Sequence, residues 1–128
     1  SINLIFKNKS ESYFRKLENE ITLEVLKKKN SVISLGGGAF LNKLIRKSAK
    51  DKSVSFWLDV EIAQLIKRLN KTKKRPLLYK KNISTTVKKI YFDREKIYSK
   101  ADYRIKCSSL KTSEIVNKIL KLYENSGN

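Results

Sequence analysis

The chain has 128 residues, a length that suits one domain. It carries 30 lysines and arginines against 12 aspartates and glutamates, a formal net charge of +18, and it contains no histidine. The absence of histidine excludes Ser-His-Asp and Cys-His nucleophile systems and histidine-based zinc sites within these residues. The single cysteine, Cys107, cannot form a disulfide within the chain.

The basic excess has three possible interpretations. Most of it is lysine spread along the whole chain, and only six of the basic residues are arginines. Scattered lysine is typical of a solvated surface. Proteins that read nucleic-acid bases or bind phosphate in a fork prefer the planar guanidinium group of arginine, which is scarce here. A dedicated nucleic-acid surface and a basic site for a small anionic ligand are the alternatives. The few arginines are therefore the residues to follow.

Hydrophobic periodicity predicts helices that alternate with short apolar strands. The predicted helices cover residues 10–29, 42–47, 60–69, 84–98 and 113–123. The predicted strands cover residues 31–35, 54–58 and 103–107, and the first of them is expected to be buried. This alternation favours an α/β fold with a parallel sheet covered by helices on both faces. We expect a single domain over residues 1–128 with no membrane-spanning segment.

The polar segment 70–82 interrupts the alternation. It contains five lysines and the only proline, Pro76, and is predicted to be a mobile loop. Arg75 stands directly before that proline. An arginine in such a segment suits a lid that closes over phosphates, although a solvated turn fits the same residues equally well.

Three consecutive glycines, Gly36, Gly37 and Gly38, follow the predicted strand 31–35. Ligands of open α/β sheets bind at such strand ends, and a backbone without Cβ atoms allows close approach and offers N–H groups. A tight strand-to-helix turn would account for one glycine. A run of three favours a binding role.

Two further positions carry charge on predicted helices. Arg15 and Glu18 lie three residues apart and share a helix face, which by spacing alone indicates an exposed ion pair worth about 0.3 kcal/mol. Arg94 lies on the helix 84–98, where a solvated arginine is the ordinary explanation.

Taken together and in this order, these motifs resemble the shikimate kinase family. The resemblance rests on Phe14-Arg15-x-x-Glu18, Leu35-Gly36-Gly37-Gly38, Arg75-Pro76-Leu77-Leu78 and Arg94-x-x-x-Tyr98, and it runs along essentially the whole chain. It implies a three-layer α/β/α parallel sheet of the P-loop NTPase type. It also implies an ATP-dependent kinase that phosphorylates the 3-hydroxyl of shikimate in aromatic amino acid (chorismate) biosynthesis.

The resemblance assigns a role to each of the residues singled out above. It implies that Arg15 and Arg94 bind the shikimate carboxylate and that Glu18 orients Arg15. The run Gly36-Gly37-Gly38 would present its backbone to the ring and its hydroxyls. Arg75 would close with the lid onto the ATP phosphates, and Arg68, just before the lid, would lie near the adenine.

The family's phosphate-binding loop, G-x-x-x-x-G-K-[ST], does not occur in this sequence, and neither does its Asp-x-Asp pair. The resemblance implies that both precede Ser1, together with the Mg²⁺ ligands and the P-loop lysine. We therefore expect these 128 residues to correspond to the C-terminal three-quarters of the enzyme and to be unstable and inactive by themselves.

The resemblance further implies a cytoplasmic monomer with shikimate and ATP as its ligands and no membrane or nucleic-acid partner. A non-enzymatic module that binds RNA or another polyanion is the alternative. It accounts for the net charge of +18 but not for the glycine run, the Arg75-Pro76 lid or the buried strands.

Overall fold

The computed structural model describes residues 11–71 and 83–127. The chain divides into two compact units, Ser1–Ser53 and Val54–Asn128. The single domain expected from the sequence stays a prediction.

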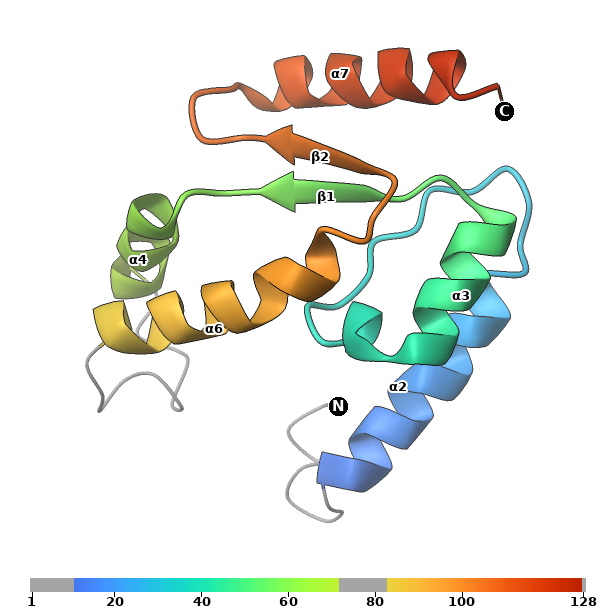
Figure 1. Cartoon of the computed structure of the whole chain (residues 1–128), viewed down its shortest axis with the longest axis horizontal. Coiled ribbons are helices and arrows are strands. Elements are labelled where there is room, and N and C mark those ends of the chain that lie inside the picture. The colour runs from blue at the N-terminus through green and yellow to red at the C-terminus, as the bar shows by residue number, and fades with distance from the viewer. Residues whose placement is uncertain (1–10, 72–82, 128) are drawn as a thin grey trace. The chain divides into compact units, whose positions relative to one another are not determined.

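The first unit is helical where the structure describes it. Its elements are α2 (Glu11–Val25), the short 3-10 helix η1 (Ala39–Leu41) and α3 (Lys43–Lys52) (Figure 1). α2 lies beside α3 and also contacts η1. A small apolar cluster forms the core of this unit and consists of Leu26, Ala39, Ile45 and Ala49.

An amide cap begins α3. Asn42 Oδ1 accepts hydrogen bonds from the backbone N–H groups of Leu44, at 2.9 Å, and Ile45, at 3.1 Å. The first N–H groups of a helix have no partner within it, so such a cap contributes about 1 kcal/mol. The cap fixes the start of α3 shortly after the glycine run.

The predicted buried strand 31–35 is wrong: these residues form neither a strand nor a buried segment. Val32 is fully exposed, whereas Ile33 and Leu35 pack partly against the apolar cluster of the first unit. Alternate side chains therefore still point to opposite sides, as in an extended chain. A strand also needs a second strand to pair its backbone N–H and C=O groups, and the sheet found in the described residues is two-stranded and does not include this segment.

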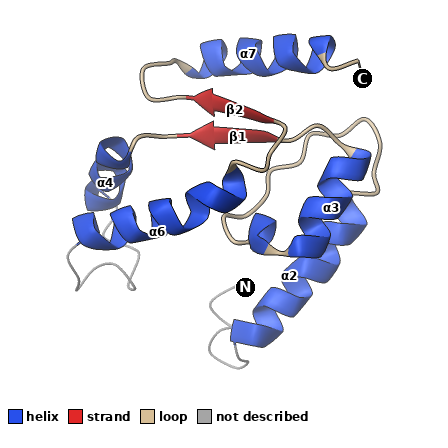
Figure 2. Ribbon diagram, viewed as in Figure 1, coloured by secondary structure: helices blue, strands red, loops and turns tan. Residues whose placement is uncertain are grey.

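The second unit contains a small sheet and three helices among its described residues. In chain order these elements are β1 (Phe56–Asp59), α4 (Ile62–Lys71), α6 (Ile83–Tyr98), β2 (Tyr103–Lys106) and α7 (Thr112–Asn125). α4 packs against α6, and α7 lies along β2 (Figure 2). The helical link between the strands is the crossover that a parallel pair requires.

β1 and β2 pair in parallel, as predicted, with Phe56 opposite Tyr103 and Asp59 opposite Lys106. A reciprocal pair of hydrogen bonds holds the beginnings of the strands together. The Ser55 N–H donates to Asp102 Oδ2, and the Asp102 N–H donates to Ser55 Oγ, each at 2.9 Å. These bonds fix the register of the two strands.

The predicted helices all occur, with shifted ends. α3 runs five residues beyond the predicted 42–47, and α6 begins at Ile83, so Ser84 lies inside its first turn instead of capping it. α4 extends to Lys71, so the first two residues of the predicted lid 70–82 are helical. The rest of that lid, including Arg75, lies outside the described residues. None of the helices in the described ranges is long and apolar enough to cross a membrane.

Candidate functional site

The first unit brings four of the predicted site residues together around one guanidinium group. Arg15 lies in α2, and its Nη1 donates to Glu18 Oε1, one turn further along the helix, at 2.9 Å. The Arg15 side chain is 41% exposed and that of Glu18 is 21% exposed, so the ion pair lies at the surface but is partly covered. The Phe14 ring centre lies 5.4 Å from Arg15 Cζ. The guanidinium group is thus held from two sides within its own helix.

The glycine run packs directly against this ion pair. A Cβ atom at Gly38 would lie 2.6 Å from Arg15 Nη1 and 3.1 Å from Arg15 Cζ, and one at Gly36 would lie 3.3 Å from Glu18 Oε2. The guanidinium group therefore occupies the space that a side chain at Gly38 would need. The Ala39 N–H donates to the Gly36 carbonyl at 3.0 Å and closes the turn around Gly37.

This arrangement suits the binding of a carboxylate. A guanidinium group has five N–H donors in one plane. Glu18 Oε1 accepts a hydrogen bond from only one Arg15 nitrogen, Nη1, at 2.9 Å. Two parallel donors match the two oxygens of a carboxylate and give charge-assisted hydrogen bonds. Glu18 and the glycine turn limit the conformations of the Arg15 side chain, which lowers the entropy lost when a ligand binds.

The other predicted arginines belong to the second unit. Arg94 lies on α6 and donates from Nη1 to the Tyr98 hydroxyl at 3.4 Å, one turn along the same helix. Arg68 lies in the last turn of α4, which packs against α6. Arg75 lies outside the described residues.

A buried carboxylate, Asp59 at the end of β1, was missed by the sequence analysis. Its exposed fraction is 6%, and its Oδ2 accepts hydrogen bonds from Arg104 Nε at 2.8 Å and Nη2 at 2.5 Å. The Tyr91 hydroxyl donates to Asp59 Oδ1 at 2.9 Å. The sequence does show an acidic residue at the end of an apolar strand, which could have marked Asp59 as a candidate. Its partners, however, lie 32 and 45 residues away in the sequence, so the spacing of residues does not reveal them.

These contacts change the acidity of the groups around Asp59. Burial, and next the hydrogen bond to Asp59, raise the pKa of the Tyr91 hydroxyl above its usual value of 10.0. The hydrogen bonds to Asp59 raise the pKa of Arg104. Tyr91 therefore stays protonated and Arg104 charged at neutral pH, so every donor around the carboxylate is in place.

The single cysteine is structural. Cys107 follows β2, is buried, and its Sγ donates to the Ile105 carbonyl at 3.3 Å. Burial, and next the negative charge of Asp59, raise the pKa of the Cys107 thiol. A buried thiol of raised pKa is a poor nucleophile, so nothing here indicates thiol catalysis.

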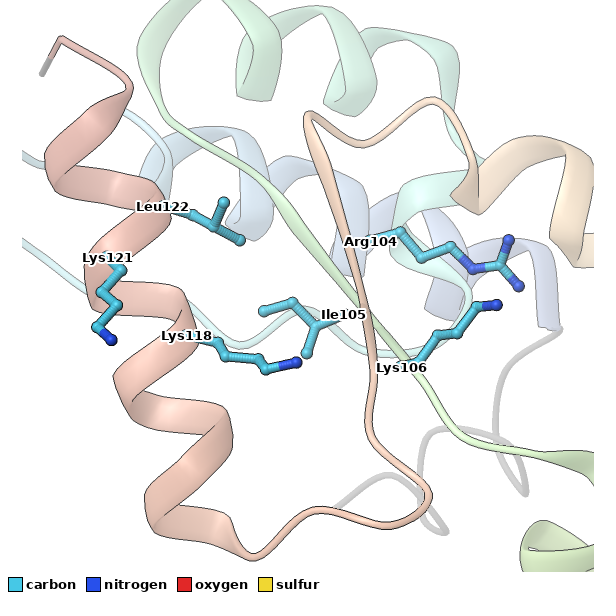
Figure 3. A pocket seen from close by; sticks show the side chains of 6 residues that line it. All are labelled: Arg104, Ile105, Lys106, Lys118, Lys121 and Leu122. Carbon is cyan, nitrogen blue, oxygen red and sulfur yellow. The ribbon is translucent and has the colours of Figure 1, made fainter.

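A basic hollow of about 510 Å³ lies between β2 and α7 (Figure 3). It is lined by Arg104, Ile105, Lys106, Lys118, Lys121 and Leu122. Three of its four cations are lysines on flexible stems, and Arg104 is already held by Asp59. Most of the donors of this hollow are therefore flexible lysines, unlike the oriented guanidinium group of Arg15. Across residues 11–71 and 83–127, no three carboxylate or thiol groups lie close enough to hold a metal ion.

Comparison with known proteins identifies the class. The model of the family described as "Shikimate kinase" matches residues 1–124 of this chain. The chain is 38% identical to the shikimate kinase of Bartonella henselae over 82% of its own length and 50% of that protein. It is 36% identical to the shikimate kinase of Aquifex aeolicus over 98% of its length and 73% of that protein.

Solved structures agree. The shikimate kinase from Acinetobacter baumannii in complex with shikimate matches with a TM-score of 0.87 and 26% identity, over 98% of this chain and 71% of that one. The Aquifex aeolicus shikimate kinase matches with a TM-score of 0.83 and 35% identity, over 99% of this chain and 74% of that one. The α/β fold class predicted from the sequence is confirmed.

This chain belongs to the shikimate kinase family, as its motifs indicated. It spans 50% and 60% of the lengths of the shikimate kinases of Bartonella henselae and Bartonella quintana.

Proposed function

We propose that the protein is an ATP-dependent kinase that phosphorylates the 3-hydroxyl of shikimate, a step in aromatic amino acid biosynthesis. Membership of the shikimate kinase family supports this proposal, and the similar enzyme from Acinetobacter baumannii binds shikimate. The single observation that carries it is the position of the Arg15 guanidinium group in the space that a side chain at Gly38 would fill.

Arg15 is proposed to bind the shikimate carboxylate through paired hydrogen bonds. Glu18 holds Nη1 at 2.9 Å, and the glycine turn lies against the guanidinium group, so the donors are oriented before the ligand arrives. The backbone of Gly36, Gly37 and Gly38 is proposed to contact the ring and its hydroxyls. Arg94 is proposed as the second cation for the same carboxylate.

ATP is proposed as the phosphoryl donor, with Mg²⁺ as its counter-ion. Phosphoryl transfer depends on positioning and charge neutralisation more than on a nucleophilic side chain, which fits a chain without histidine. Arg75 is proposed to contact the phosphates and Arg68 to lie near the adenine. The described residues offer no cluster for the metal, so no magnesium ligand is assigned to them. The proposal includes a cytoplasmic, monomeric enzyme.

Shikimate-dependent release of ADP tests this proposal, measured on the protein produced from its complete reading frame. We expect saturable ADP release that requires shikimate. Replacing Arg15 by Ala raises the KM for shikimate by roughly 10-fold or more, because a charge-assisted hydrogen bond is lost. The neighbouring exposed position provides the control, and Lys16→Ala leaves the KM unchanged.

The opposite pattern would overturn the proposal. Without shikimate-dependent ADP release in the wild-type protein, the kinase assignment fails. RNA binding that weakens steeply with salt and is indifferent to Arg15→Ala would instead favour the polyanion-binding alternative.

A further inference from the structure

Helix α6 is attached to strand β1 at two points on one helix face. Tyr91 and Tyr98 are seven residues apart, close to two full turns, so both side chains lie on the same side of the helix. Each tyrosine contacts a residue of β1, and Arg94 stands between them in the sequence. We call the five residues that make these contacts the β1–α6 clamp: Trp57, Asp59, Tyr91, Tyr98 and Arg104.

The first attachment point is polar and centres on the buried carboxylate of Asp59. The Tyr91 hydroxyl donates to Asp59 Oδ1 at 2.9 Å, while Arg104 donates twice to the other oxygen of the same carboxylate. Asp59 is 6% exposed, so little water can reach it to replace these donors. Moving Tyr91 away would leave a buried carboxylate oxygen short of one hydrogen bond, which opposes any shift of this end of α6.

The second attachment point is aromatic. The ring centres of Trp57 and Tyr98 are 6.1 Å apart with the planes tilted by 59°, a common geometry for aromatic pairs. The Arg104 guanidinium carbon lies 4.5 Å from the Trp57 ring centre. Arg104 therefore links the two attachment points, since it contacts Asp59 and Trp57 at once.

Arg94 lies between these points on the same face, three residues after Tyr91 and four before Tyr98. Its Nη1 donates to the Tyr98 hydroxyl at 3.4 Å. The ring of Tyr98 is placed by Trp57, so its hydroxyl is a fixed acceptor for an otherwise flexible side chain. The position of Arg94 thus depends on residues of β1 and β2 as well as on its own helix.

We propose that the β1–α6 clamp positions Arg94, and that Tyr98 and Asp59 act as positioning residues for carboxylate binding. This inference rests on the function proposed above. A ligand carboxylate must meet both donors of the guanidinium fork, so a displacement of about 1 Å weakens the contact. The clamp resists such displacement in two ways. It fixes α6, which carries the Arg94 backbone, and it fixes the Tyr98 hydroxyl, which orients the Arg94 guanidinium group.

The test compares tyrosine variants in the protein produced from its complete reading frame. Tyr98→Phe keeps the ring on Trp57 and removes the acceptor for Arg94. We expect the KM for shikimate to rise roughly three- to tenfold, while kcat and the KM for ATP stay within about twofold. Tyr123→Phe removes one hydroxyl from an exposed tyrosine of α7 and changes none of these values.

A second variant pair tests the other attachment point. Tyr91→Phe is expected to raise the KM for shikimate in the same selective way, through the position of α6. Thermal unfolding of Tyr91→Phe, Asp59→Ala and the double variant tests the clamp without any substrate. Because the two side chains share one hydrogen bond, the double variant should lower Tm by less than the sum of the single variants.

The possible outcomes distinguish a failure of the clamp proposal from a failure of the proposed function. An unchanged KM for shikimate in Tyr98→Phe, or equal losses in kcat and in the KM values for both substrates, would overturn the positioning role. Additive Tm shifts would overturn the clamp itself. If the wild-type protein phosphorylates no shikimate, the proposed function fails and the carboxylate role of Arg94 falls with it, while the Tm comparison still decides whether the clamp exists.

Discussion

Gly38 has backbone angles of φ −92° and ψ −14°, which any residue can adopt. The backbone conformation therefore does not require a glycine here, and only the lack of room for a side chain does. The neighbour that a Cβ atom would meet is the end of the Arg15 side chain, which can move aside. An alanine at this position should therefore displace the guanidinium group without disturbing the backbone.

We predict that Gly38→Ala weakens the binding of shikimate but leaves the stability of the fold nearly unchanged. The KM for shikimate should rise by roughly 10-fold, because the displaced guanidinium group loses a charge-assisted contact. The midpoint of urea unfolding should change little. Ser34→Ala, at an exposed position of the same segment, is the control for both measurements. A large loss of stability with unchanged KM would show that Gly38 serves the turn and not Arg15.

Tyr91 gives a prediction about alkaline pH. Its pKa is raised in the folded protein, first by burial and then by the hydrogen bond to Asp59, with Glu95 adding to the effect and Arg104 opposing it. An unfolded tyrosine loses its proton near pH 10, at about its ordinary pKa. Above that pH the unfolded state binds fewer protons than the folded state, so the free energy of unfolding falls as pH rises.

The measurement is the difference in Tm between pH 8 and pH 10.5, compared for the wild-type protein and Tyr91→Phe. The decrease in Tm should be larger in the wild-type protein, since only it carries a hydroxyl at position 91 that stays protonated in the folded state and loses its proton on unfolding. The comparison between the two proteins cancels the titration of the many lysines. Equal decreases in Tm for the two proteins would mean that folding does not raise the pKa of Tyr91.

At the scale of whole elements, α3 depends on the cap at its beginning. Asn42→Ala removes the acceptor of two backbone N–H groups, those of Leu44 and Ile45, and should lower the free energy of unfolding by about 1 kcal/mol. Asn42→Asp keeps an acceptor and adds a negative charge at the positive end of the helix, so it should retain the stability. Urea unfolding measures both. A fully stable Asn42→Ala variant would contradict this account of the cap.

The helices could be predicted from the sequence because the signal is local. Phe14, Leu17, Ile21 and Val25 recur at helical spacing, and α2 covers all four. Residues 31–35 have the composition of a strand, but a strand requires a partner, and composition does not say whether one is present. The ends of α4 and α6 shifted because boundary residues differ little in helical preference.

The site could be predicted only in part for the same reason. The short spacing of Arg15 and Glu18 predicted their ion pair, and the motif order pointed to the glycine run packed against it. The Asp59 cluster could not be predicted, because the crossover that makes β1 and β2 parallel also carries Tyr91 and Arg104 to it. Such contacts become visible only when the strand pairing is known.

At the scale of the whole molecule, the net charge of +18 gives every anion some attraction to the chain. General attraction does not distinguish one carboxylate from another, and it weakens as salt rises. The claim of a shikimate site therefore depends on an oriented guanidinium group and not on the number of lysines. A ligand that differs only in its carboxylate can separate the two effects.

The most direct test compares the affinities of shikimate and its methyl ester for the wild-type protein and for Arg15→Ala, by calorimetric titration at physiological salt. The wild-type protein, produced from its complete reading frame, should bind the acid roughly 10- to 100-fold more tightly than the ester, as expected for hydrogen bonds to a charged group. Arg15→Ala should lose most of this preference while its affinity for the ester changes little. A preference for the acid that survives in Arg15→Ala would contradict the central role given to the Arg15 guanidinium group.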